Sequence, residues 1–169
     1  EQIEFTVSYS GFPKKAIRPP WDGGFVWSKD KNNNPWIGVA CEGDGASLWW
    51  PNKDHPTEEP DSMEIIITVP SNMVAVANGK FVSKQIFEND SSDFNIEKAR
   101  YTWSVKNPIN NYNVTLNIGD YVTVSDTLMN KAGVQFIDHY VLSYSKEVAS
   151  EHFKQAIDVV HYFEKVFGE

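Results

Sequence analysis

The chain has 169 residues and a formal net charge of −8 at pH 7, and 41% of its residues are hydrophobic and 14% aromatic. This length is enough for one domain with a hydrophobic core, or for one domain and part of another. The acidic balance argues against nucleic-acid binding, which needs Lys and Arg against phosphates. The single cysteine, Cys41, excludes an internal disulfide and a multi-cysteine zinc site.

No apolar run approaches the roughly 20 residues that a membrane-spanning helix needs. The sequence also shows no signal peptide at Glu1 and no initiating Met. We therefore expect a soluble piece of a longer or processed protein with no membrane partner. Its cellular compartment is not readable from the sequence.

The first half of the chain is dominated by β signals. A two-residue alternation predicts a half-buried strand at its start, formed by Ile3, Phe5, Val7 and Tyr9. Gly11–Pro20 is rich in Gly and Pro and breaks regular structure. Phe25–Ser28 and Trp36–Ala40 then predict two strands of a hairpin around the polar segment Lys29–Pro35.

The next predicted strand is Met63–Val69, whose three consecutive isoleucines indicate burial on both faces, or on one face under an aromatic lid. Met73–Ala77 and Lys80–Phe87 follow on either side of Asn78-Gly79. Asn-Gly between two apolar runs is typical of a type I′ turn, so these two strands are predicted to form a hairpin.

The remainder continues as strands and then changes period. Glu88–Asn95 is polar and predicts an exposed loop. Alternating residues predict further strands, at Arg100–Lys106, Val114–Ile118, Tyr121–Val124 and Val134–Tyr144. From Ser145, a predicted N-cap, apolar residues recur at spacings of three and four as far as Phe167, and Gly168 suits a C-cap. The fold is therefore predicted to be mainly β, a curved antiparallel sheet or β-sandwich, with one C-terminal α-helix.

The segment Ala40–Pro56 combines two adjacent tryptophans with glycines, prolines and acids, and it predicts a shaped loop that holds a carboxylate. It resembles the N-terminal domain of the aminopeptidase N family of zinc metallopeptidases. Six positions match the family's spacing: Glu42, Ala46, Trp50, Pro51, Asp54 and Pro56. Two positions depart, because Ser47 stands where Arg is usual and Asn52 where Cys is usual.

Other segments extend the resemblance over roughly Gly23–Val124 and the last helix. The run Gly23–Trp27 resembles a Gly-aromatic segment of the family, and Arg100–Val124 resembles its Trp-containing strand, Pro turn and apolar strand ending in Gly-Asp. The resemblance implies a saddle-like β domain over residues 1–143, present in part. Residues 144–169 would then be the first helix of a catalytic domain that lies outside this chain and is its expected partner.

Glu42 is the one predicted substrate-binding residue. In the family, the residue at this position binds the free α-amino group of the substrate peptide. A peptide N-terminus is largely a cation at neutral pH, and a fixed carboxylate makes a charge-assisted hydrogen bond to it. Gly43 and Gly45 would let the backbone run close to a substrate. An exposed loop acid without a ligand is the alternative interpretation.

The resemblance implies zinc in the full-length parent, but this chain holds neither the His-Glu-x-x-His motif nor the Gly-x-Met-Glu-Asn motif. We therefore predict no catalytic and no metal-binding residue here, and no activity for this chain alone. The histidines are expected at the surface or an interface: His55, His139, His152 and His161.

Three other features have structural interpretations. Asp54 is predicted to bond nearby backbone in a turn, and Cys41 to be a small, partly buried residue. The tryptophans are expected mainly in the core, with an interface or a glycan platform as alternatives: Trp21, Trp27, Trp36, Trp49 and Trp50. The alternative function to an aminopeptidase fragment is a β-sandwich module that binds peptide or glycan.

Overall fold

The computed structural model describes residues 3–43, 45–55, 57–88, 96–131 and 133–168. The chain forms two compact units, Glu1–Gly119 and Asp120–Glu169. The units divide ahead of the predicted boundary at residues 143 and 144, and the assignment of 144–169 to a separate catalytic domain stays a prediction. The predicted loop Glu88–Asn95 falls almost entirely outside the described residues.

The first unit contains a four-stranded antiparallel sheet in the order β1-β2-β7-β4. Its strands are β1 (Gly24–Lys29), β2 (Pro35–Ala40), β7 (Leu116–Gly119) and β4 (Val74–Ala77). The predicted β1–β2 hairpin is confirmed. Its turn is closed by Asp30, whose carboxylate accepts hydrogen bonds from the backbone N–H groups of Asn32 and Asn34.

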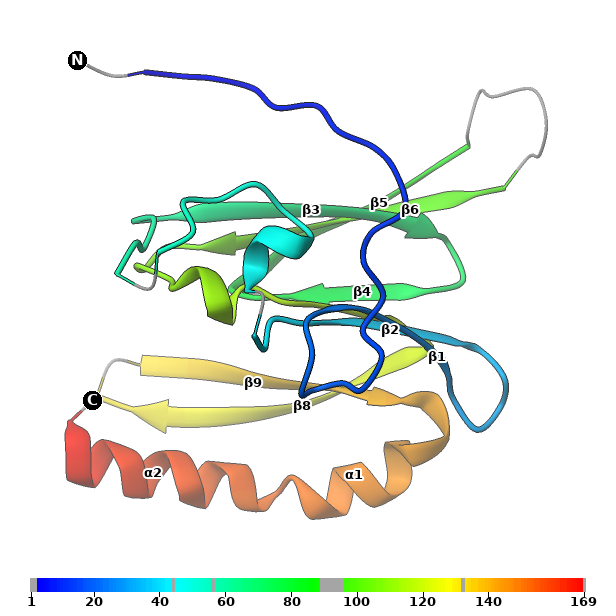
Figure 1. The fold of residues 1–169 in the computed structure, drawn as a ribbon. Helices are drawn as coiled ribbons and strands as arrows, with labels where there is room; N and C mark the ends of the chain where they lie inside the picture. The colour runs from blue at the N-terminus through cyan, green and yellow to red at the C-terminus, as the bar shows by residue number, and fades with distance from the viewer. Residues whose placement is uncertain (1–2, 44, 56, 89–95, 132, 169) are drawn as a thin grey trace. The chain divides into compact units, whose positions relative to one another are not determined.

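A second antiparallel sheet in this unit has the order β3-β6-β5, made of β3 (Met63–Pro70), β6 (Lys98–Val105) and β5 (Lys80–Phe87). In Figure 1 this sheet lies over the one that contains β4. On β3, Ile65 and Ile67 are half-buried while Ile66 is exposed. The predicted burial of β3 on one face is therefore confirmed, and burial on both faces is wrong.

The central strand β6 supplies much of the core between these sheets. Alternate β6 residues are buried, namely Ala99, Tyr101, Trp103 and Val105. Tyr101 Oη donates a hydrogen bond to the Met73 carbonyl at 3.0 Å, and Trp103 Nε1 donates to the Ala75 carbonyl at 3.1 Å. Two aromatic side chains of one sheet thus satisfy backbone carbonyls in and just before β4 of the other.

The predicted hairpin at Asn78-Gly79 is wrong, although both strands exist. β4 pairs with β7 and β5 pairs with β6, so the chain crosses from one sheet to the other at this dipeptide. Asn78 lacks the positive φ of a type I′ turn. Its side chain instead donates to the Asn113 carbonyl at 3.0 Å and accepts from the Thr115 N–H at 2.7 Å. We refer to Asn78-Gly79 as the sheet corner.

The predicted strand at Ile3–Tyr9 is also wrong. Residues 3–9 belong to no strand, and the apolar side chains predicted to be half-buried are exposed. The alternation does mark an extended segment, but a strand also needs a neighbour for its backbone groups. No described residue pairs with this segment.

The second unit is a hairpin followed by helices. Its elements are β8 (Tyr121–Asn130), β9 (Gly133–Leu142), α1 (Lys146–His152) and α2 (Gln155–Phe167). Leu128 of β8 is fully buried, and α1 contacts both strands. The predicted helical segment is confirmed but is divided at Phe153 and Lys154. Ser145 occupies the N-cap without a capping side-chain hydrogen bond, whereas Gly168 forms the predicted C-cap.

The fold class is confirmed as mainly β, with antiparallel sheets and a C-terminal helical segment. Three short 3-10 helices complete the described elements: η1 (Ala46–Leu48), η2 (Asn111–Asn113) and η3 (Ser143–Ser145). Of the helices that the structure describes, none has the length and apolar character required to cross a bilayer.

Candidate functional site

Glu42 lies in a tight turn directly after β2. Cys41 is buried at the end of the strand, and Glu42 is exposed. Gly43 and Gly45 have φ values of 73° and 77°, in the left-handed region that favours glycine. The Gly45 N–H donates to the Cys41 carbonyl at 2.9 Å and closes the turn. The predicted shaped loop is confirmed, and it presents the Glu42 carboxylate at the surface.

Tyr112 in η2 holds this carboxylate, although 70 residues separate the two in sequence. Its Oη donates to Glu42 Oε2 at 2.8 Å. This hydrogen bond and the negative charge of Glu42 raise the pKa of the Tyr112 phenol, so the phenol stays protonated and keeps donating at neutral pH. In the described part of the chain no Lys, Arg or His forms an ion pair with Glu42.

A pocket of about 390 Å³ adjoins the pair. Its lining is mainly apolar, with one carboxylate and two hydroxyl groups: Pro20, Trp21, Val39, Ala40, Cys41, Glu42, Tyr112 and Thr115. Glu42 accepts the hydrogen bond from Tyr112 Oη at Oε2. The carboxylate can therefore accept further hydrogen bonds from a cationic group of a ligand. An apolar part of the same ligand can occupy the pocket.

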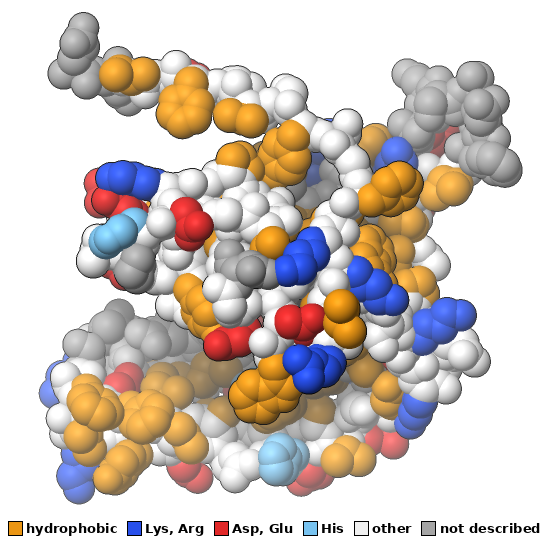
Figure 2. All heavy atoms as spheres, in the orientation of Figure 1, with side chains coloured by type: hydrophobic (Ala, Val, Ile, Leu, Met, Phe, Trp, Pro, Cys, Tyr) orange, Lys and Arg blue, Asp and Glu red, His pale blue; other side chains and the backbone are white. Residues whose placement is uncertain are grey.

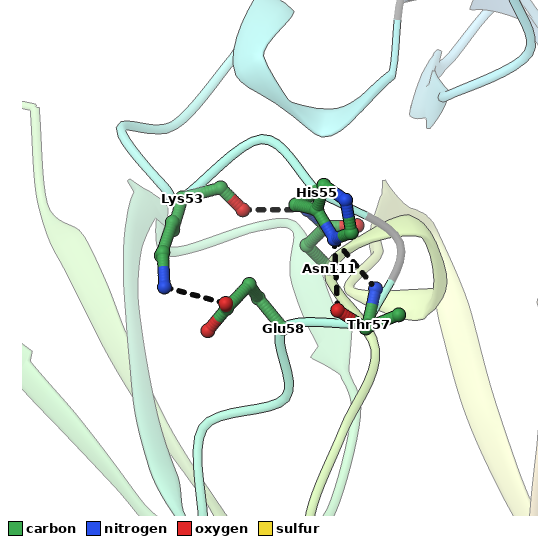
Figure 3. A network of polar contacts seen from close by, with 5 residues as sticks. All are labelled: Lys53, His55, Thr57, Glu58 and Asn111. Atoms are coloured by element: carbon green, nitrogen blue, oxygen red, sulfur yellow. Dashed lines mark hydrogen bonds and ion pairs between the residues drawn. The ribbon is translucent and has the colours of Figure 1, made fainter.

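Figure 3 shows Asn111 of η2 bonded to the backbone at Lys53, with two further contacts in the same loop, between His55 and Thr57 and between Lys53 and Glu58. Asn111 is buried, and its Nδ2 donates to Asn52 Oδ1 at 3.2 Å and to the Lys53 carbonyl at 3.1 Å. Thr57 hydrogen-bonds His55 Nδ1, and Lys53 pairs with Glu58. Asn111 thus fixes the backbone next to the tyrosine that orients Glu42.

Asn52, which stands where the resembled family has Cys, has a clear packing role. Its Oδ1 accepts from Asn111, and its Nδ2 donates to the Trp50 carbonyl at 2.9 Å. Asp54 is exposed, and the predicted hydrogen bond to nearby backbone is not formed with any described residue. A Cβ at Gly45 would contact Asp54 Oδ1 at 3.5 Å, so the carboxylate lies beside the Glu42 turn.

The prediction that the tryptophans are mainly core residues is wrong for three of them. Trp21, Trp27 and Trp36 are 79%, 51% and 37% exposed, and Trp49 and Trp50 are half-buried. The tryptophan that does lie in the core is Trp103, which is 4% exposed. The alternating pattern of β6 indicates a buried position for this residue.

The histidines and the cysteine are largely as predicted. His55, His152 and His161 are exposed. His139 is half-buried, and its ring stacks on Phe153 at 4.3 Å between centroids. Burial raises the pKa of the Cys41 thiol, which disfavours the nucleophilic thiolate. The described residues contain no group of three or more His, Cys, Asp or Glu side chains placed to hold a metal ion.

Sequence reasoning missed Tyr112, because nothing local in the run Asn110–Asn113 marks its partner. The two residues meet only after β2 and β7 pair, with Ile37 opposite Ile118. No protein-family model matches the chain, and no curated protein matches it.

Proposed function

We propose that Glu42 binds the free α-ammonium group of a peptide, and that this chain is the N-terminal part of a zinc aminopeptidase of the aminopeptidase N type. The observation that carries the proposal is the exposed Glu42 carboxylate, oriented by Tyr112 at the mouth of an apolar pocket. The six-position motif from Glu42 to Pro56 links that geometry to the family.

The chemistry divides between this chain and polypeptide outside it. A bound zinc ion would supply an activated water for peptide hydrolysis, and its ligands would belong to the catalytic domain. Glu42 would hold the ammonium group by a charge-assisted hydrogen bond. An internal peptide bond offers no ammonium group, so the same contact would restrict cleavage to the first residue. The apolar wall would take part of that residue's side chain.

Exposed apolar residues on α2 support the proposed catalytic-domain partner. Five large side chains at helical spacing remain exposed: Val159, Tyr162, Phe163, Val166 and Phe167. A helix with such a face normally buries it against another element. In the full-length protein these residues would pack on the catalytic domain, and their amides should exchange more slowly with solvent than in this chain alone.

The direct test uses the product of the complete reading frame and the variant Glu42→Gln. We expect kcat/KM for a substrate with a free amino group to fall by about 10- to 100-fold, because a hydrogen bond to a charged group contributes roughly 1.5–3 kcal/mol. The matched control is Glu59→Gln, an exposed acid outside the pocket. Unchanged kinetics for Glu42→Gln, or a reading frame without a zinc motif, would refute the proposal.

A second candidate is a β module that binds peptide or glycan, and the exposed tryptophans favour it. The strand register limits this idea, since Trp27 lies opposite Ile37 while Trp36 lies opposite Ser28. Residues directly opposite share a face, so Trp27 and Trp36 face opposite sides of the hairpin and form no common platform. A glycan-induced change in tryptophan fluorescence, lost in Trp27→Ala, would support this function instead.

A further inference from the structure

The N-terminal segment, residues 3–9, has the side-chain pattern of a strand without being one. Ile3, Phe5, Val7 and Tyr9 alternate with polar residues and are 81%, 82%, 52% and 64% exposed. Figure 2 shows hydrophobic side chains spaced along this segment. Exposure of four large apolar residues in one short extended stretch is the pattern of a surface that associates with something else.

The backbone of the segment is open as well. No backbone hydrogen bond joins residues 3–9 to any other described residue. An extended chain with free N–H and C=O groups is a template for an added strand, whose main-chain hydrogen bonds supply affinity.

Two residues on the apolar side of the segment, Val7 and Tyr9, also line a pocket of about 600 Å³. Val7 and Tyr9 form one wall, with Phe25, Trp49 and Trp50 among the other lining residues. Tyr9 Oη donates to the Trp49 carbonyl at 3.2 Å and holds the segment beside the aromatic residues. An isolated pair of strands is marginally stable, and this pocket supplies the third surface against which added side chains can pack.

We propose that residues 3–9 bind an extended peptide strand of a partner protein by antiparallel strand addition. The backbone sets the extended conformation, and the pocket selects apolar side chains at alternate positions of the added strand. Glu4 is the charged residue of the segment, so a basic residue opposite it completes the match.

A second copy of the chain fits less well than such a partner. Self-pairing centred on Thr6 sets Glu4 opposite Ser8, which leaves the carboxylate without a cation. It also brings together two chains that each carry a net charge of −8. The charge pattern therefore favours a partner strand that is neutral or basic.

The probe is the capped peptide acetyl-Val-Thr-Val-Thr-Val-Lys-Val-amide, which sets Lys opposite Glu4 in antiparallel register. Binding to the chain is followed by NMR and calorimetry. We expect saturable binding, with new hydrogen-exchange protection at every second amide of residues 3–9, because one edge of a strand pairs at a time.

Val7→Asn and Ser8→Asn are the matched variants, adjacent in sequence and on opposite sides of the segment. Val7→Asn should weaken binding by about tenfold or more, because the added strand would cover Val7 and the complex would lose that apolar side chain from the pocket. Ser8→Asn should leave the affinity within about twofold, since surface substitutions of this kind have small effects. Both variants change an exposed segment and should leave the far-ultraviolet circular dichroism of the protein unchanged.

Three results would overturn the inference. The first is no binding of the peptide at millimolar concentration. The second is an equal loss of affinity in both variants, which would show that the pocket side of the segment is not used. The third is a dimer of the chain by sedimentation that Val7→Asn dissociates, which would assign the segment to a second copy.

Discussion

At the scale of the residue, Glu42 and Tyr112 act as a pair joined by one hydrogen bond. The tyrosine fixes one carboxylate oxygen, and the carboxylate keeps the phenol protonated. Local sequence predicted Glu42, through its glycine-bounded turn and motif spacing. It could not predict Tyr112, because a contact between segments 70 residues apart depends on the pairing of β2 with β7.

This coupling predicts a shift in the titration of Tyr112. Glu42→Gln removes the negative charge that favours the protonated phenol, so the pKa of Tyr112 should fall toward its ordinary value. The measurement is an NMR titration of carbon-labelled tyrosine between neutral and strongly alkaline pH. Glu59→Gln should leave this pKa unchanged, and an unaltered pKa in Glu42→Gln would show that the hydrogen bond is absent in solution.

Among the described glycines of the first unit, Gly79 at the sheet corner should tolerate substitution least. It has a φ of 88°, and a Cβ there would clash with the Ser104 carbonyl oxygen. Gly79→Ala should therefore lower the free energy of unfolding by more than the roughly 1–2 kcal/mol of a left-handed alanine.

Gly43→Ala is the control for Gly79→Ala in a urea titration. Gly43 has a similar φ of 73°, but apart from its chain neighbours no described residue has an atom within 4 Å of the added Cβ. Gly43→Ala should therefore lower the free energy of unfolding only by the cost of placing alanine in the left-handed region, about 1–2 kcal/mol. Equal losses in the two variants would mean that the contact with Ser104 relaxes without cost.

At the scale of the element, the two-residue alternation of apolar side chains predicted where most strands lie, but it did not predict which strands pair with each other. The β1–β2 hairpin was predictable because a polar turn separates two apolar runs that are adjacent in the sheet. The hairpin at the sheet corner was predicted wrongly, because β4 and β5 each find a more distant partner and Asn78 bonds to the segment before β7. The wrong prediction of a strand at Ile3–Tyr9 has the same cause. Alternation shows which side chains share a face, but it does not show whether another strand lies beside the segment.

The β8–β9 hairpin offers a sharp test of that face assignment. Leu128 is 1% exposed and the adjacent Met129 is 69% exposed, as expected for opposite faces of one strand. Leu128→Ala should cost about 2–5 kcal/mol of stability, because it leaves a cavity in the core. Met129→Ala should stay within about 0.5 kcal/mol. Comparable losses, measured by urea unfolding of the helical signal, would contradict the assigned faces.

At the scale of the whole molecule, the two compact units carry different spectroscopic signals. All six tryptophans precede Gly119, and both α-helices follow Asp120. Tryptophan fluorescence therefore reports the first unit, and the helical circular dichroism reports the second. Composition and period predicted a mainly β chain with a helical end, but they did not predict this division, which follows from contacts distant in sequence.

The division predicts separate responses to a mutation in one unit. Leu128→Ala should lower the urea midpoint of the helical signal by more than that of tryptophan fluorescence, because Leu128 belongs to the second unit. Equal shifts of both midpoints would show that the two units unfold as one cooperative structure.

The sheet corner has a consequence for the chemical ageing of the protein. Asn-Gly is the dipeptide in which the following backbone nitrogen most readily attacks the side-chain amide carbon. This attack expels ammonia and forms a succinimide, which water then opens to isoaspartate and aspartate. Here the Asn78 amide is held by Asn113 and Thr115, and Gly79 is confined against Ser104. Cyclisation requires the corner to open, so isoaspartate at position 78 should accumulate in proportion to the fraction of molecules in which the corner is open. The isoaspartate content of a stored sample would therefore measure how often this corner unfolds locally.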